Sequence, residues 1–76
     1  MKYRVNFERI GRNHGPEPML IEADDAEDLA LKIFTYIRKH KLLASREFEV
    51  TVDLELMKGS LDFGRFGNFT IEEVKE

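Results

Sequence analysis

The chain contains no cysteine and no tryptophan, and only two of its 76 residues are proline. Without cysteine, the chain can form neither a disulfide framework nor a thiolate metal site. The sequence also lacks an apolar run long enough to span a membrane, and residues 1–9 carry charges where a signal peptide would be apolar. These absences predict a protein of a reducing compartment, and we expect a cytoplasmic location.

Positive charge is scarce as well. The formal net charge is −3 and the isoelectric point is near 5.4. This balance disfavours extensive phosphate binding, which requires clustered Lys and Arg. At 42% hydrophobic residues, with six Phe, the chain has enough apolar mass for a core. Its length predicts a single domain over residues 1–76, near the lower size limit for independent folding.

The clearest pattern is the alternation of apolar and polar residues over positions 48–56. Even positions carry Phe, Val, Val, Leu and Leu, and the odd positions between them carry Glu, Thr, Asp and Glu. A period of two predicts a strand with one buried face and one solvent-exposed face. We expect this strand to span residues 46–57, a tight turn to follow at 58–60, and a row of carboxylates on its solvent side.

Three further elements precede that strand. Alternation from Tyr3 predicts a first strand that ends near Ile10, and residues 19–23 form a short second strand after a Gly- and Pro-rich loop at 11–18. Apolar residues then recur at three- and four-residue steps from 26 to 37, which predicts an amphipathic helix that extends to about residue 41. We expect Asp24 to be its N-cap, with Glu27 completing a capping box.

The final segment is less regular. Alternation resumes at 61–63 and is interrupted at 64–68, where a bulge, a kink or a second turn is expected. Phe69, Ile71 and Val74 then define the last strand. We expect Phe63 and Phe69 to point inward and Phe66 to be partly exposed.

This element order predicts an α+β fold, a two-layer sandwich of ββαββ order. One helix packs on a sheet of four strands, or five if the last is split, and the sheet is antiparallel or mixed. In one topology the first and last strands pair in parallel at the centre, an order that resembles the ubiquitin-like β-grasp over the whole chain. The chain ends Val74-Lys75-Glu76 instead of in the di-glycine of conjugated members, so the resemblance implies no modifier role. The other topology is entirely antiparallel, with the third strand beside the first.

Two surfaces are candidates for binding a protein partner. The first is the loop at 11–18, and the second is the acidic side of the third strand, which would receive a basic partner or mimic a phosphate backbone. The same acidic side chains also suit solubility and protection of a sheet edge, and the alternative for the loop is a simple connection between two strands. The candidate partner-binding residues are Arg12, Asn13, His14, Glu49, Thr51, Asp53 and Glu55, with Glu47 beside them.

Nucleic acid is the alternative partner. A basic cluster lies at the predicted end of the helix, and a cation next to an aromatic residue lies near the last strand. Basic residues also suit the C-terminal end of a helix dipole, which explains the first cluster without a ligand. The candidate contacts are Arg38, Lys39, Lys41, Arg65 and Phe66.

Catalytic chemistry has little support. His14 and His40 have no partner at metal-ligand spacing, and no Ser-His-Asp or Glu-His pattern suggests a nucleophile with its base. We therefore expect no enzyme activity, no cofactor, no metal and no membrane association. The sequence predicts a small non-catalytic protein-interaction or regulatory accessory module whose partner is another protein or a second copy in a homodimer. The alternative is a nucleic-acid-binding accessory protein.

Overall fold

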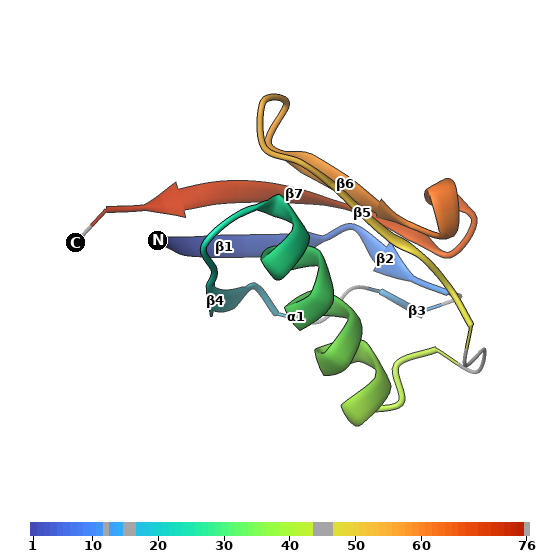
Figure 1. The fold of residues 1–76 in the computed structure, drawn as a ribbon. Coiled ribbons are helices and arrows are strands. Elements are labelled where there is room, and N and C mark those ends of the chain that lie inside the picture. Colours follow the sequence, from blue (N-terminus) through green and yellow to red (C-terminus); the bar gives the residue numbers. More distant parts are fainter. Residues whose placement is uncertain (12, 15–16, 44–46, 76) are drawn as a thin grey trace.

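In the computed structural model, which describes residues 1–11, 13–14, 17–43 and 47–75, one helix lies across one face of a five-stranded sheet (Figure 1). The elements in chain order are β1 (Lys2–Phe7), β2 (Arg9–Ile10), β3 (Asn13–His14), β4 (Met19–Glu22), α1 (Ala26–Lys39), β5 (Val50–Asp53), β6 (Lys58–Leu61), the 3-10 turn η1 (Asp62–Gly64) and β7 (Gly67–Val74). No helix in the described ranges is long and apolar enough to cross a membrane.

The sheet has the strand order β4-β1-β7-β6-β5, and β2 pairs with β3 in a small separate ladder. Every neighbouring pair of strands in the main sheet is antiparallel. The helix follows β4 at one edge and leads to β5 at the other, so it crosses the sheet between its two outermost strands. The α+β class, the single covering helix and the split last strand are confirmed.

The topology combines one feature of each predicted solution. The first strand pairs with the last, as in the β-grasp-like order, but Val5 and Ile71 meet in an antiparallel ladder. The expected parallel pairing is therefore wrong, and so is the placement of the third strand beside the first, because β5 lies at the far edge. The physical reason is the additional reversal at η1, which inverts the direction of β7 relative to a chain with a single hairpin.

The turn between β5 and β6 occupies residues 54–57, not the expected 58–60. Asp53 Oδ1 accepts hydrogen bonds from the backbone N–H groups of Glu55 (2.9 Å) and Leu56 (3.1 Å). Met57 then adopts a left-handed conformation with φ of 54°. These local bonds from an Asp side chain stabilise a turn where alternation alone predicted continued strand.

Gly59 allows β6 to lie close to the buried Phe69 ring of β7. It lies opposite Phe69 in the ladder between β6 and β7. A Cβ at this position would overlap the Phe69 ring and the carbonyl oxygen of Thr51. The absence of a side chain therefore lets the buried ring lie directly against β6.

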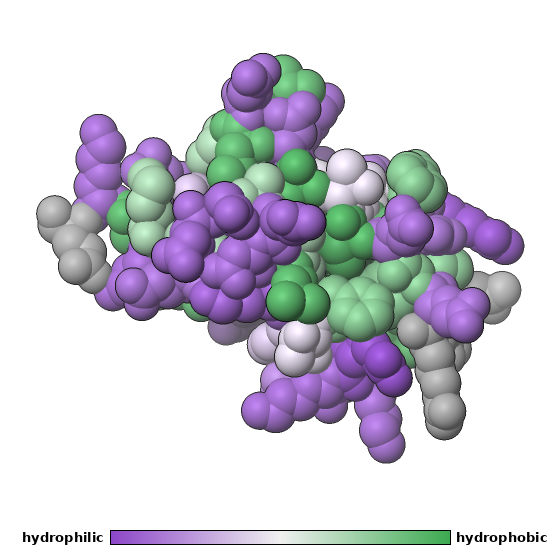
Figure 2. Space-filling model, viewed as in Figure 1, coloured by the Kyte–Doolittle hydropathy of each residue, from purple (hydrophilic) through white to green (hydrophobic). Residues whose placement is uncertain are grey.

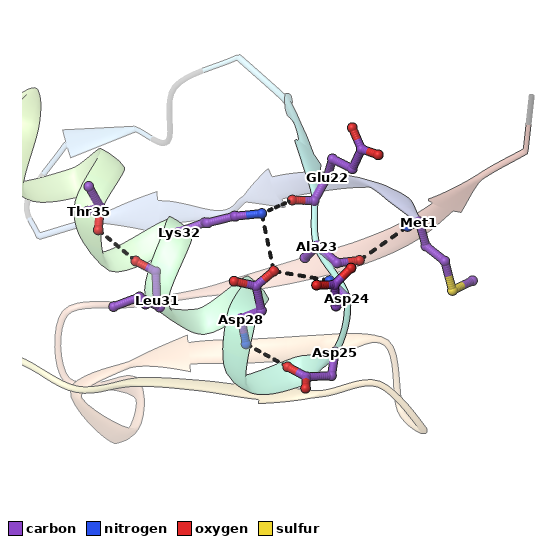
Figure 3. Close-up of polar contacts among 9 residues, drawn as sticks. All are labelled: Met1, Glu22, Ala23, Asp24, Asp25, Asp28, Leu31, Lys32 and Thr35. Carbon is purple, nitrogen blue, oxygen red and sulfur yellow. Dashed lines mark hydrogen bonds and ion pairs between the residues drawn. The ribbon is translucent and has the colours of Figure 1, made fainter.

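The helix begins one residue later than expected and ends two residues earlier. Asp25 is the N-cap, and its Oδ1 accepts the Asp28 backbone N–H at 2.8 Å (Figure 3). Asp28 Oδ2 in turn accepts the backbone N–H of Asp24 at 3.1 Å. The cap is thus formed by Asp25 and Asp28, with Asp28 bonded to the residue before the N-cap, instead of by Asp24 and Glu27. At the other end, α1 ends at Lys39. Lys41 adopts a left-handed conformation with φ of 53°, which a right-handed helix does not contain.

The core lies between α1 and one face of the sheet, here called the inner face. The helix contributes Leu29, Ile33 and Ile37, all almost completely buried. The strands contribute the buried residues Tyr3, Val5, Phe7, Leu61, Phe69 and Ile71. Each fully buried large apolar side chain stabilises a fold by about 1.5–3 kcal/mol, so this single apolar layer holds α1 against the sheet.

Candidate functional site

The face of the sheet opposite the helix, here called the outer face, is polar. Its side chains alternate with those of the core along each strand, as the burial patterns of β1, β5 and β7 show. A shallow groove of about 500 Å³ crosses this face over β5, β6 and β7. The side chains that line it most directly are Thr51, Asp53, Ser60, Phe63, Asn68 and Thr70. Thr51, Ser60, Asn68 and Thr70 give it a lining of small polar side chains.

Phe63 forms an aromatic wall of this groove. The expected inward orientation is wrong, since the side chain is 76% exposed. Asp62 and Phe63 both adopt left-handed conformations, with φ of 50° and 56°, and this turns Phe63 out of the alternation. Two consecutive non-glycine residues in that region cost about 1–3 kcal/mol each, and such strain concentrates at functional sites. A large exposed ring on a strained turn is therefore a candidate contact residue.

The acidic residues predicted on the third strand do not share one strand. Thr51 and Asp53 lie on β5 and point to the outer face, where both are exposed. Glu49 precedes β5, and its carbonyl oxygen accepts the Asp62 backbone N–H at 2.5 Å. Glu55 lies in the turn that Asp53 stabilises. The structure thus brings Glu49, Thr51 and Asp53 together along the β5 edge and places Glu55 at its end.

Negative charge is local to that edge. On the middle strands the outer face carries both signs, with Arg4 on β1 paired to Glu72 on β7 at 3.5 Å. Lys58 lies opposite Asp53 in the ladder between β5 and β6. The groove itself therefore has mixed charge, with Asp53 at the β5 edge, Lys58 on β6 and Glu8 after the end of β1.

The start of the loop at 11–18 lies beside the segment after η1, because the Gly11 N–H donates to the Phe66 carbonyl at 2.6 Å. Asn13 and His14 form β3, which pairs with Arg9 and Ile10 of β2. Arg12 lies outside the described residues. Arg9 approaches both turns at this end of the sheet, donating from Nη1 to the Gly11 carbonyl at 2.8 Å and from Nη2 to that of Gly64 at 3.4 Å.

The five residues proposed for nucleic acid occupy two separate places. Arg38 and Lys39 are exposed in the last turn of α1, and Lys41 follows it. Arg65 follows η1, with its guanidinium carbon 5.5 Å from the centre of the Phe66 ring. Phe66 itself packs partly buried against the core. Arg38 of the helix lies over the ring of Phe34, not over that of Phe66.

Sequence patterns missed Phe63, Ser60 and Asn68 as groove residues. The combination Asp62-Phe63-Gly64 contains two turn-forming residues around the aromatic ring, and this was the available signal for an outward turn. Ser60 and Asn68 carried no signal, because their proximity depends on the pairing of β6 with β7.

The described residues contain no group of three or more His, Asp or Glu side chains arranged to hold a metal ion. Comparison with protein-family models, with curated proteins and with solved structures finds no match to this chain. Its binding chemistry is therefore inferred from its own surface.

Proposed function

We propose that the chain is a small non-catalytic protein-interaction or regulatory accessory module that binds its partner through the outer face of the sheet beside β5. The observation that supports this most directly is the groove of about 500 Å³ with Phe63 exposed on its wall. Exposed aromatic side chains at the margin of a concave polar surface are suited to anchoring protein partners. The other face of the sheet is covered by α1, which leaves this face for binding.

The test is capture of partners by immobilised protein from extracts of its source cells, followed by calorimetry with each purified candidate. Phe63→Asn removes the aromatic wall, and Asn tolerates the left-handed backbone at this position. Leu31→Asn is the matched control, because Leu31 is another large exposed apolar residue but lies on α1. We expect a stoichiometric partner that binds the wild type and the Leu31 variant and is lost from the Phe63 variant.

Two results would contradict the proposal. One is equal retention of every captured protein by the wild type and both variants. The other is binding of a short single-stranded oligonucleotide that weakens steeply with salt and is lost when Arg38 and Lys39 are changed to Gln, which would support the nucleic-acid alternative.

A further inference from the structure

The backbone of β5 has hydrogen-bonding groups directed away from the sheet. In an antiparallel ladder, residue pairs alternate between those that exchange hydrogen bonds and those that do not. The Asp62 N–H donates to the Glu49 carbonyl, so this pair and the Thr51–Ser60 pair two residues further are of the bonded kind. Val50 falls between these two pairs, and Val52 falls between the Thr51–Ser60 pair and the next bonded pair, Asp53–Lys58. The N–H and C=O groups of Val50 and Val52 therefore point to the open side of β5.

The opposite edge of the sheet has the same alternation, and a side chain bonds one of its outward backbone groups. Met1 and Ala23 exchange hydrogen bonds at 2.9 and 3.2 Å, which leaves the Glu22 carbonyl pointing outward from β4. Lys32 of the helix donates to that carbonyl at 2.5 Å and is held by Asp28 at 3.1 Å (Figure 3). Within the described ranges, no side chain makes an equivalent bond to Val50 or Val52.

The side chains on the outer face of β5 oppose pairing with a second copy. A two-fold axis between two antiparallel β5 strands can be centred on Val50, Thr51 or Val52. With the axis at Thr51, Glu49 lies opposite Asp53 of the copy. With the axis at Val50, Asp53 lies opposite Glu47, and with the axis at Val52, Glu49 lies opposite Glu55. Like charges directly opposite destabilise a strand pair. The charge pattern therefore disfavours a homodimer at this edge and favours an incoming strand with cations on that face.

The helix side of the same edge is apolar. Val50 and Val52 are only partly buried against the core. Phe34 of α1 packs on Phe48, with ring centres 4.7 Å apart, and Figure 2 shows hydrophobic surface in the strip between α1 and β5. Arg38 lies over the Phe34 ring at 5.7 Å, which disfavours a second cation on this side. A strand added here would thus require apolar residues toward the helix.

We infer that β5 is the docking edge for an extended basic segment of a protein partner, which adds a strand to the sheet. Its backbone bonds to Val50 and Val52, its Lys or Arg side chains lie opposite Glu49 and Asp53, and its alternate apolar side chains contact Phe34. This inference rests on the proposed function and names the chemistry of the partner. The acidic side chains that oppose pairing of β5 with a second copy are the same ones that attract the cations of this segment.

The probe is a short blocked peptide that alternates valine with lysine. Its affinity is measured by fluorescence anisotropy, and amide hydrogen exchange of the protein is followed by NMR. We expect the peptide to protect the amides of Val50 and Val52 from exchange. Glu49→Gln combined with Asp53→Asn should weaken binding about tenfold, since Asn retains the acceptor that stabilises the turn. Glu73→Gln, at the end of β7 that pairs with Tyr3, is the matched control and should leave binding unchanged.

A second peptide has the same charges but is N-methylated at the residues that would donate to β5, and we expect it not to bind. Equal binding of the methylated peptide would overturn strand addition, because the attraction would then be electrostatic alone. If the protection of the Val50 and Val52 amides grows with protein concentration in the absence of peptide, β5 pairs with a second copy of the chain, and the inference of a basic partner segment is wrong. If partner capture remains sensitive to Phe63→Asn while no peptide protects β5, the edge inference is wrong and the interaction module stands.

Discussion

The two edge strands, β4 and β5, have the same length and opposite surroundings. β4 is held on its open side by Lys32, and its end is tied to Met1 through the Ala23 carbonyl and N–H. β5 is held on its paired side by β6 and carries acidic side chains on its outer face. The difference shows two ways to manage a sheet edge. A cation from another element satisfies the backbone, whereas charge on the strand itself only restricts which partner can approach.

The largest predicted effect concerns the attachment of β5 to the sheet. Gly59→Ala should destabilise the fold by about 3 kcal/mol, because the new Cβ overlaps both the Phe69 ring and the Thr51 carbonyl. For a domain of this size that would leave a substantial unfolded fraction. Urea unfolding monitored by circular dichroism measures the loss. Ser60→Ala, next along β6 and facing outward, should change the free energy of unfolding by less than about 0.5 kcal/mol; a similar loss in both variants would contradict the steric explanation.

The second prediction separates the charge of the β5 edge from its turn. Asp53→Ala should cost about 1 kcal/mol of stability, since two backbone N–H groups in the turn lose their acceptor. Asp53→Asn should retain most of that stability, because the amide oxygen accepts the same bonds. Thermal and urea unfolding of the two variants provide the comparison. Equal destabilisation would show that the charge, not the hydrogen bonds, stabilises residues 54–57.

The third prediction concerns the β4 edge, where Lys32 bonds the Glu22 carbonyl. Lys32→Met should cost about 0.5 kcal/mol, because the ion pair with Asp28 and the bond to the Glu22 carbonyl are both at the surface. Amides on the paired side of β4 should then exchange faster with solvent, and those of β6 should be unaffected. Lys39→Met, in the last turn of α1, is the matched control. Unchanged exchange in β4 would mean that Lys32 does not secure this edge.

The smallest effect is a dependence on pH at the same edge. The backbone N–H of Asp24 and the Lys32 ammonium favour the charged form of Asp28, so the pKa of Asp28 lies below its usual value. A lowered folded-state pKa stabilises the protein above the unfolded-state pKa of about 3.9, and this contribution is lost as the pH falls through the folded-state value. The stability advantage of the wild type over Asp28→Asn at pH 7 should therefore shrink at pH 2, as urea unfolding at both pH values would measure. A constant difference would contradict the assignment.

Local signals in the sequence predicted the fold class well. The spacing of Leu29, Ile33 and Ile37 indicated the buried stripe of the helix, and the alternation of Tyr3, Val5 and Phe7 indicated the inner face of β1. These patterns are reliable because each depends on a single element and one apolar layer. The N-cap was displaced by one residue because adjacent aspartates offer equivalent acceptors.

The topology and the groove were harder to predict. The direction of β7 depends on whether the chain reverses at η1, and that reversal depends on Asp62 and Phe63 adopting conformations unusual for those residues. The turn at 54–57 depends on one carboxylate oxygen within a segment whose alternation favoured a strand. The acidic edge was identified from the sequence, but its separation from the mixed charge of the groove depends on the pairing of β5 with Lys58 and its neighbours.

The central pairing of β1 with β7 also has a consequence for synthesis. Val5 pairs with Ile71 and Lys2 with Val74, so the middle of the sheet joins β1 to β7, which run side by side in Figure 1 although they are far apart in the sequence. Contacts so distant in sequence form slowly, and a ribosome-bound chain must expose the apolar side of β1 until β7 has emerged. Nascent chains stalled before residue 67 should therefore be digested readily by protease, and chains extended well beyond residue 74 should become resistant. The sheet should therefore form only after β7 has left the ribosome, as one cooperative event.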